Sequence, residues 1–274
     1  MQPVSLFLIP TIASFIWPAI MLVSNKPMFK AQWLMLITQV IIGCSIGLYD
    51  AYYGELIHNS YVADVMYTIV AVFCAPTFYM FVCSLSGKYG ITRQNRLIYI
   101  PTLIYLISFV VIVFTLGGER YDQYMVNVID NGNYTLRPSK AYTAMIIVGY
   151  WGFRGFLLLQ TVLVLIFSAV KIKRYHKELR SRNIIPSSAR YVHTCSYLMA
   201  LVITWLAIFP RRMSSGEVSP LLVVLAILCA VLQLLVGYYA YRIRFTAEQL
   251  EIMRHEEELR HKPTPYSIEK NPQM

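Results

Sequence analysis

Charged side chains are scarce in this chain of 274 residues, since Asp, Glu, Lys and Arg together fill 14% of the positions and only 14 residues are acidic. Average soluble domains carry about 25% charged residues. Hydrophobic residues make up 57% of the chain, and the mean hydropathy is +0.52. This composition excludes an ordinary soluble domain and predicts that lipid surrounds most of the protein.

Several residue patterns that enzymes and photoreceptors need are also missing. The chain has no H-E-x-x-H pattern and no Ser, His and acidic trio at one membrane depth, so we expect no enzyme activity. No Lys falls within an apolar segment, which excludes a retinal Schiff base. The five cysteines lack paired spacing, so we expect packed thiols and neither a disulfide framework, a metal site nor a cofactor.

Long apolar segments are the main feature that is present. A membrane-spanning helix needs about 20 predominantly apolar residues. The segments that meet this requirement are Val4–Ser24, Trp33–Tyr53, Val65–Ser86, Leu97–Leu116, Met145–Val170, Tyr191–Phe209 and Pro220–Tyr241. We therefore expect an all-α membrane protein with a seven-helix transmembrane domain over residues 1–242, a cytoplasmic helical extension over 243–262 and a disordered tail over 263–274.

The basic residues predict how these helices are oriented. Lys and Arg near the ends of spans are retained on the cytoplasmic side. Most of those in the connections follow the first, third and fifth spans, and residues 171–190 hold the largest group. The N-terminus is therefore expected outside and the C-terminus in the cytoplasm, in a protein integral to the cell (inner or plasma) membrane. Because the basic residues follow the membrane boundary, the net charge of +10 indicates contact with membrane lipid and no direct nucleic acid binding.

The longest outer connection, Gly117–Ala144, contains a turn signal. Asn131-Gly132-Asn133 lies between the short apolar runs Val126–Ile129 and Tyr134–Leu136. This arrangement predicts a small β-hairpin over the outer mouth of the helices.

Proline and glycine predict local features of the spans. Pro76 is expected to kink or unwind the third span. Gly43 and Gly47 form a G-x-x-x-G pair that lets another helix approach closely. The inner segment Lys171–Arg182 is expected to extend the fifth span as a helix that breaks by Pro186.

The only charged residues within the seven segments are Asp50 and Arg154. A charge in hydrocarbon is costly and usually marks a functional site or an internal ion pair. At about 1.5 Å per residue, both lie outward of their span centres, Asp50 by about 10 Å and Arg154 by about 5 Å. We expect an Asp50–Arg154 ion pair in an outer-facing pocket for a small polar or anionic ligand. Tyr53, Tyr150 and Trp151 lie near the same depth and are expected to line this pocket.

Other interpretations remain open at this point. If no ligand site exists, two alternatives remain. The Asp50–Arg154 ion pair would only hold two helices together, or backbone carbonyls and Tyr hydroxyls would accept the hydrogen bonds of Arg154. A small transporter or channel would need a polar path through the inner half, for which Gln39, Gln160 and Gln233 are the candidates. A non-catalytic membrane scaffold would need no pocket at all.

The chain leaves its last span through Gly237-Tyr238-Tyr239-Ala240-Tyr241-Arg242 and continues as a charged helix. On that helix Ile243, Leu250 and Met253 share one face. This face fits a short contact for a homodimer or a cytoplasmic partner, and a solvated helix without a partner is the alternative.

This exit and the seven-span layout resemble the N-terminal membrane input regions of bacterial, Bacteroidetes-type, membrane-tethered AraC-type regulators and of histidine kinases. The resemblance covers essentially the whole chain and implies a sensor function, with an effector domain after the last span. The chain ends at Met274 without one, so we expect a truncated or standalone input domain. No DNA-contacting or phosphorylated residue can be carried over.

Overall fold

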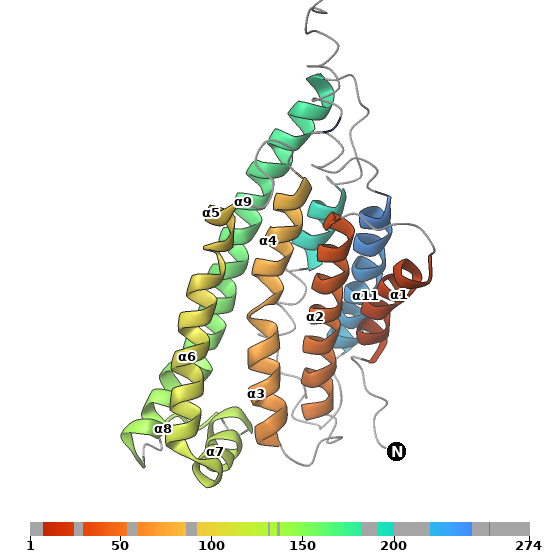
Figure 1. The fold of residues 1–274 in the computed structure, drawn as a ribbon. Coiled ribbons are helices and arrows are strands. Elements are labelled where there is room, and N and C mark those ends of the chain that lie inside the picture. Colours follow the sequence, from red (N-terminus) through yellow and green to blue (C-terminus); the bar gives the residue numbers. More distant parts are fainter. Residues whose placement is uncertain are drawn as a thin grey trace, which may run out of the picture.

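The computed structural model describes residues 8–24, 30–53, 60–85, 92–130, 132–135, 138–181, 191–199, 220–242 and 252; of residues 50–53, 60, 130, 178 and 222 it describes the backbone alone. The described residues are almost entirely helical, and none of them forms a strand. The helices make an elongated bundle (Figure 1). The all-α prediction is therefore confirmed for the part of the chain that is described.

The first two helices, α1 (Leu8–Val23) and α2 (Lys30–Tyr53), pack closely against each other. A Cβ added to Gly43 would lie 2.8 Å from the Cβ of Ser14, and one added to Gly47 would lie 3.2 Å from Thr11. Close approach of these helices therefore requires glycine at position 43. The predicted G-x-x-x-G contact exists, and its partner is α1.

The third apolar segment is broken in its middle. It forms α3 (Ser60–Ala71) and α4 (Cys74–Leu85), separated by a turn at Val72 and Phe73. Pro76 has no N–H to donate to the carbonyl of Val72, four residues earlier, and its ring disfavours a regular helix there. The predicted break at Pro76 is confirmed, and it divides the segment into two helices of 12 residues each.

The next segment contains α5 (Arg93–Arg96), α6 (Tyr99–Leu116), α7 (Gly118–Tyr124) and the π-helix η1 (Met125–Asp130). The predicted β-hairpin is wrong, because its first strand lies in η1 and residues 132–135 form no strand. Only the turn signal holds, since Gly132 has a positive φ of 63°. An isolated hairpin buries little apolar surface, whereas the helical segment buries Met125 and Val128 in a cluster with α6.

The fifth apolar segment is the longest helical unit. It begins with α8 (Lys140–Ala144), widens into the π-helix η2 (Met145–Gly152) and continues as α9 (Phe153–Ser181). A Cβ on Gly152 would lie 3.0 Å from the carbonyl oxygen of Ile147, so the wide turn favours glycine there. The predicted helical extension beyond Lys171 is confirmed to Ser181.

The remaining described helices are residues 191–199 and α11 (Pro220–Tyr241). Several predictions fall outside the described residues and stay predictions. They concern residues 4–7, Pro186, residues 200–209, the partner face of Ile243, Leu250 and Met253, the extension over 243–262 apart from Ile252, and the tail over 263–274.

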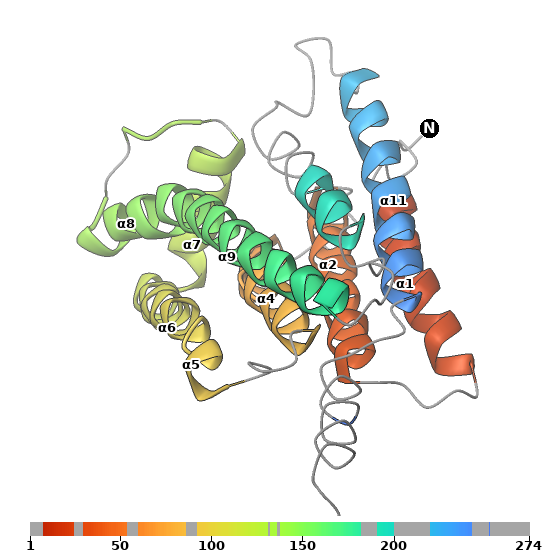
Figure 2. The same cartoon turned by 90° about the horizontal axis from the view of Figure 1, so that it is seen from above.

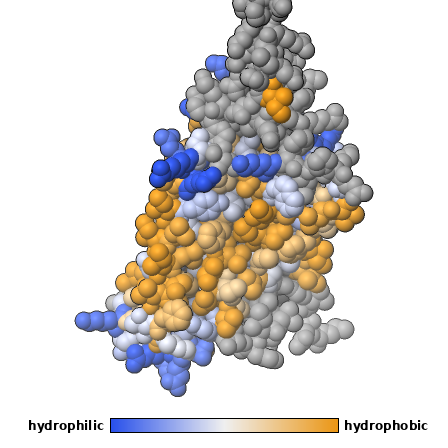
Figure 3. Space-filling model, in the orientation of Figure 1, coloured by the Kyte–Doolittle hydropathy of each residue, from blue (hydrophilic) through white to orange (hydrophobic). Residues whose placement is uncertain are grey.

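Five described helical units are long and apolar enough to cross a membrane, namely Lys30–Tyr49, Tyr61–Leu85, Arg93–Leu116, Lys140–Ser181 and Val223–Tyr241, and α1 is a shorter apolar helix. Figure 3 shows a hydrophobic band across one face, with hydrophilic residues above and below it. These features indicate a membrane protein. The start of α2, α5 and the C-terminal end of α9 lie at one end of the bundle, and α7 and α8 lie at the other (Figure 1). The first of these is here called the basic end and the second the α7 end.

Packing places α4 between α2 and α9, while α1 contacts both α2 and α11 (Figure 2). One buried cluster joins α2, α4, α9, residues 191–199 and α11, and a second joins α6, α7, η1, α8 and η2 at the α7 end. The second cluster contains three fully buried tyrosines, Tyr121, Tyr124 and Tyr142.

Candidate functional site

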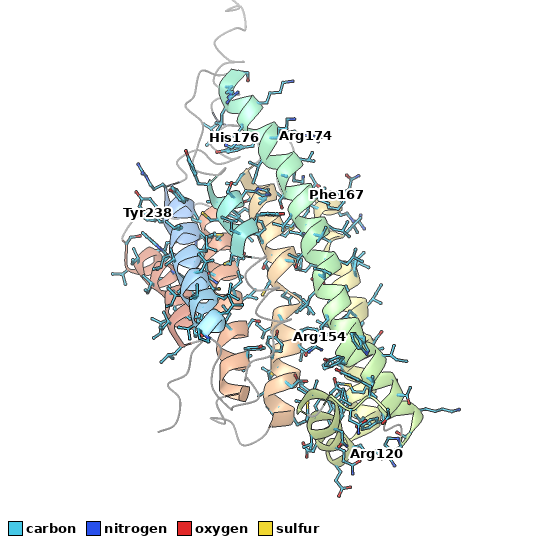
Figure 4. All side chains as sticks on the ribbon, turned by 180° about the vertical axis from the view of Figure 1, so that it is seen from behind. Arg120, Arg154, Phe167, Arg174, His176 and Tyr238 are labelled. Atoms are coloured by element: carbon cyan, nitrogen blue, oxygen red, sulfur yellow. The ribbon has the colours of Figure 1, made fainter. Side chains whose placement is uncertain are left out.

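Arg154 lies in the first turn of α9, in the half of the bundle nearer to the α7 end (Figure 4). Its Nη1 donates a hydrogen bond to the carbonyl oxygen of Tyr150 at 3.2 Å, and its Cζ lies 3.6 Å from the centroid of the Tyr150 ring. Helical side chains point toward the N-terminus of their helix, so residue 150 is within reach of residue 154. The Arg154 side chain is exposed and makes no ion pair with another described side chain.

Tyr150 also contacts Tyr134 and Trp151, and these three aromatic residues are called the aromatic cluster below. The hydroxyl of Tyr134 donates to the hydroxyl of Tyr150 at 2.7 Å, which raises the pKa of Tyr134. The ring centroids of Tyr134 and Trp151 are 5.7 Å apart, and those of Tyr150 and Trp151 are 5.1 Å apart. The ring of Tyr150 therefore contacts Arg154, and its hydroxyl accepts from Tyr134 in the connection between η1 and α8. The structure thus brings together three of the predicted site residues, Arg154, Tyr150 and Trp151.

The other predicted site residues are not placed beside Arg154. The side chains of Asp50 and Tyr53 lie outside the described part of the chain, so the Asp50–Arg154 ion pair stays a prediction. The one described contact of the Arg154 head group is with Tyr150, as in the alternative in which backbone carbonyls and aromatic groups satisfy the arginine.

A carboxylate that the sequence analysis did not select lies near this arginine. Asp64, on α3, accepts a hydrogen bond at 2.5 Å from the hydroxyl of Tyr121 on α7. Burial, and then the Asp64 charge, raise the pKa of Tyr121 far above its ordinary value, so the phenol stays protonated and acts as the donor. The hydropathy boundary at Val65 placed Asp64 in a loop, whereas α3 begins at Ser60 and holds Asp64 in its second turn.

The charges of Asp64 and Arg154 both affect the pKa of Tyr124. Burial raises the pKa of Tyr124 well above its ordinary value, Asp64 raises it further, and Arg154 lowers it in part. Both charged groups therefore act on one buried tyrosine of α7. Among the described side chains Asp64 and Arg154 form no ion pair, so Arg154 keeps a positive charge that no contact carboxylate neutralises.

Contacts between helices show how deep this site lies. Tyr105 stacks on Phe156 with a centroid distance of 4.8 Å and lies 6.4 Å from Phe153, so it shares the level of Arg154. Its hydroxyl donates to the carbonyl oxygen of Val148 at 3.2 Å. Tyr105 lies well within the apolar stretch of α6, which runs from Tyr99 to Leu116. Arg154 is therefore located well inside the apolar part of the bundle.

The three glutamines that would line a polar path lie in two separate places. Gln39 donates to the carbonyl oxygen of Gln233 at 3.3 Å, which joins α2 to α11. Gln160 donates to the hydroxyl of Thr102 at 2.6 Å, which joins α9 to α6. The described residues thus do not connect Gln160 with the other two glutamines.

Comparisons of the chain with protein-family models, with curated protein sequences and with solved structures give no match. Any assignment of function therefore depends on the physical arrangement of these residues.

Proposed function

We propose that this chain is the membrane input module of a bacterial sensor or receptor-like protein, of the kind that precedes AraC-type regulators or histidine kinase cores. In this proposal seven helices span the cell (inner or plasma) membrane. The five long apolar units, α1 and the helix that starts at residue 191 supply them. The N-terminus is outside and the C-terminus is in the cytoplasm, because the helix ends at the basic end of the bundle carry basic residues. Lys30 begins α2, Arg93 and Arg96 are the first and last residues of α5, and Lys171 lies in the C-terminal part of α9.

Arg154 is the observation that carries this proposal. An arginine in the centre of a spanning helix raises the free energy of insertion by about 2.5 to 3.5 kcal/mol on translocon scales. Here the guanidinium is exposed, contacts only Tyr150 among the described side chains, and lies next to the aromatic cluster. An anionic ligand group bound to Arg154 would add a favourable electrostatic interaction and would offset part of this insertion cost.

A route from this site toward the last helix supports a sensor. His193 Nε2 lies 3.3 Å from the carbonyl oxygen of Leu165 on α9, within hydrogen-bonding distance. Two residues earlier, Tyr191 stacks on Tyr239 of α11 with a centroid distance of 5.0 Å. Residues 191–199 therefore connect the helix that holds Arg154 with the helix that leaves the membrane. Spatial continuity permits coupling, and a change of population between two helix arrangements would demonstrate it.

The transporter alternative has less support. A permeation path needs polar groups in sequence through the inner half of the bundle, and the described glutamines form two separate pairs with other helices. A non-catalytic scaffold gives no role to Arg154, which makes no ion pair with a described side chain.

A distance measurement between two helices tests the sensor proposal. Spin labels at positions 180 and 242, in a variant without the five native cysteines, report the separation of α9 and α11 by double electron–electron resonance in lipid nanodiscs. We expect two distance populations, and we expect Arg154→Leu to change their ratio. The matched control is Arg120→Leu, an arginine on α7 at the α7 end of the same bundle (Figure 4). One population, or the same ratio in both variants, would contradict a sensor role for Arg154.

A further inference from the structure

The surroundings of Arg154 on α9 are apolar and accessible. Trp151, three residues before it, is 57% exposed, and Leu158, four residues after it, is 53% exposed. Gly155 is also exposed, and a Cβ added there would meet no atom within 4 Å. The exposed face of α9 next to the guanidinium is therefore a smooth apolar surface of the kind that acyl chains cover.

Among the described side chains, Arg154 has no carboxylate in contact with it. Its described contacts are the ring and carbonyl oxygen of Tyr150, which leave several guanidinium N–H groups free to donate. Asp64 is the described carboxylate whose charge acts in the same region, and it is hydrogen-bonded to Tyr121. Phosphate and carboxylate oxygens match the donor geometry of a guanidinium.

From these two observations we propose that the ligand of this site is an anionic amphiphile, which enters sideways from the bilayer. Its anionic head pairs with Arg154 below the aromatic cluster, and its chain lies along Gly155 and Leu158. A small soluble anion would leave this apolar face uncovered and would first have to cross a hydrocarbon layer. This inference rests on the proposed sensor function, because it names the ligand class of the same site.

The exposed indole of Trp151 provides the measurement. The protein is reconstituted with phosphatidylcholine, and dibrominated phosphatidylglycerol, whose bromines quench indole fluorescence, replaces part of the lipid. Dibrominated phosphatidylcholine serves as the zwitterionic control with the same chains. The Trp151→Phe variant supplies the signal of the remaining tryptophans, which is subtracted.

We expect the anionic lipid to occupy the Trp151 site at least about fivefold more strongly than the zwitterionic lipid. One basic side chain provides this preference at a membrane surface, and Arg154 lies deeper, where water screens its charge less. Arg154→Gln should abolish this preference, Arg154→Lys should keep part of it, and Arg120→Gln should leave it unchanged. Equal quenching by the two lipids in the wild-type protein would overturn the proposal. An unchanged preference in Arg154→Gln would also overturn it.

Two further readouts separate the possible failures. Inorganic phosphate, added as a soluble anion, should leave the quenching of Trp151 by the brominated lipid unchanged. A loss of quenching on adding phosphate would show that the site is open to water and would overturn entry from the bilayer. The spin-label distances at positions 180 and 242 are measured with the same lipids. Lipid preference without any change of distance would retain the amphiphile site and reject the sensor. A change of distance with Arg154 but no lipid preference would retain the sensor and reject the amphiphile.

Discussion

The hydroxyl of Tyr121 donates a hydrogen bond to Oδ2 of Asp64 at 2.5 Å and thereby fastens α7 to α3. Tyr121 is fully buried, and its ring meets that of Tyr61 edge-on at 4.7 Å between centroids. Hydrogen bonds to an ionised acceptor are roughly twice as strong as those between neutral groups. The α7 layer is thus held by a charged contact as well as by apolar packing.

Loss of that hydroxyl should destabilise the protein. We expect Tyr121→Phe to lower the free energy of unfolding by about 1.5 to 3 kcal/mol, since Asp64 would lose its described donor. Reversible unfolding in mixed detergent micelles measures the change. Tyr61→Phe is the matched control, because Tyr61 contacts the same ring and makes no hydrogen bond within the described residues. If the two variants lost the same free energy of unfolding, the hydrogen bond to Asp64 would contribute no stability of its own.

The contact between Gly237 of α11 and Trp17 of α1 predicts a second effect. A Cβ at position 237 would overlap the Trp17 ring, which also packs on Tyr238 and Tyr241. Gly237→Ala should therefore cost about 1 to 3 kcal/mol of stability through overpacking.

Two further variants check this interpretation of Gly237. Gly155→Ala, where the added Cβ meets open space, should leave stability nearly unchanged. Combining Gly237→Ala with Trp17→Leu should restore part of the lost stability, measured against Trp17→Leu alone. A tolerated Gly237→Ala would mean that α1 and α11 separate more readily than this packing implies.

The buried glutamines should respond in opposite directions to replacement by leucine. Neither side-chain polar atom of Gln233 has a partner among the described residues, although the side chain is fully buried. Gln233→Leu should thus be neutral or stabilising by up to about 1 kcal/mol. Gln160→Leu removes the hydrogen bond to Thr102 and should destabilise by about 0.5 to 1.5 kcal/mol. A marked destabilisation by Gln233→Leu would reveal a bound water or another partner.

The proposed orientation can be tested by labelling single cysteines in intact cells. With the native cysteines removed, Thr135→Cys should react with an impermeant maleimide added outside, and Lys177→Cys should react only after the membrane is opened. Both positions are exposed in the structure. The reverse pattern would place the basic end outside and would invalidate the proposed topology.

Hydropathy alone predicted much of the helical framework. The segments around α2, α6, α9 and α11 are apolar over a length that is sufficient to cross a membrane, and Pro76 marked the break between α3 and α4. Local chemistry sufficed there, because a missing N–H acts on its own helix.

Contacts between distant segments were beyond such reasoning. Depth alone paired Arg154 with Asp50, and because the Asp50 side chain lies outside the described part of the chain, that pairing stays a prediction. Asp64 was missed because the hydropathy boundary fell one residue after it. The hairpin prediction failed because Val126 and Val128 fit either a strand or a helix, and burial against α6 decided for the helix.

Because α9 is one continuous helix, a small tilt at one end moves its other end by several ångströms. Its 29 residues extend over about 44 Å at the usual rise per residue. A tilt of about 5° near Phe153 would displace the end at Ser181 by about 4 Å over this length. The divided helix α3 and α4 can bend at Val72 and absorb such a tilt, so a small change beside Arg154 would be amplified at the basic end.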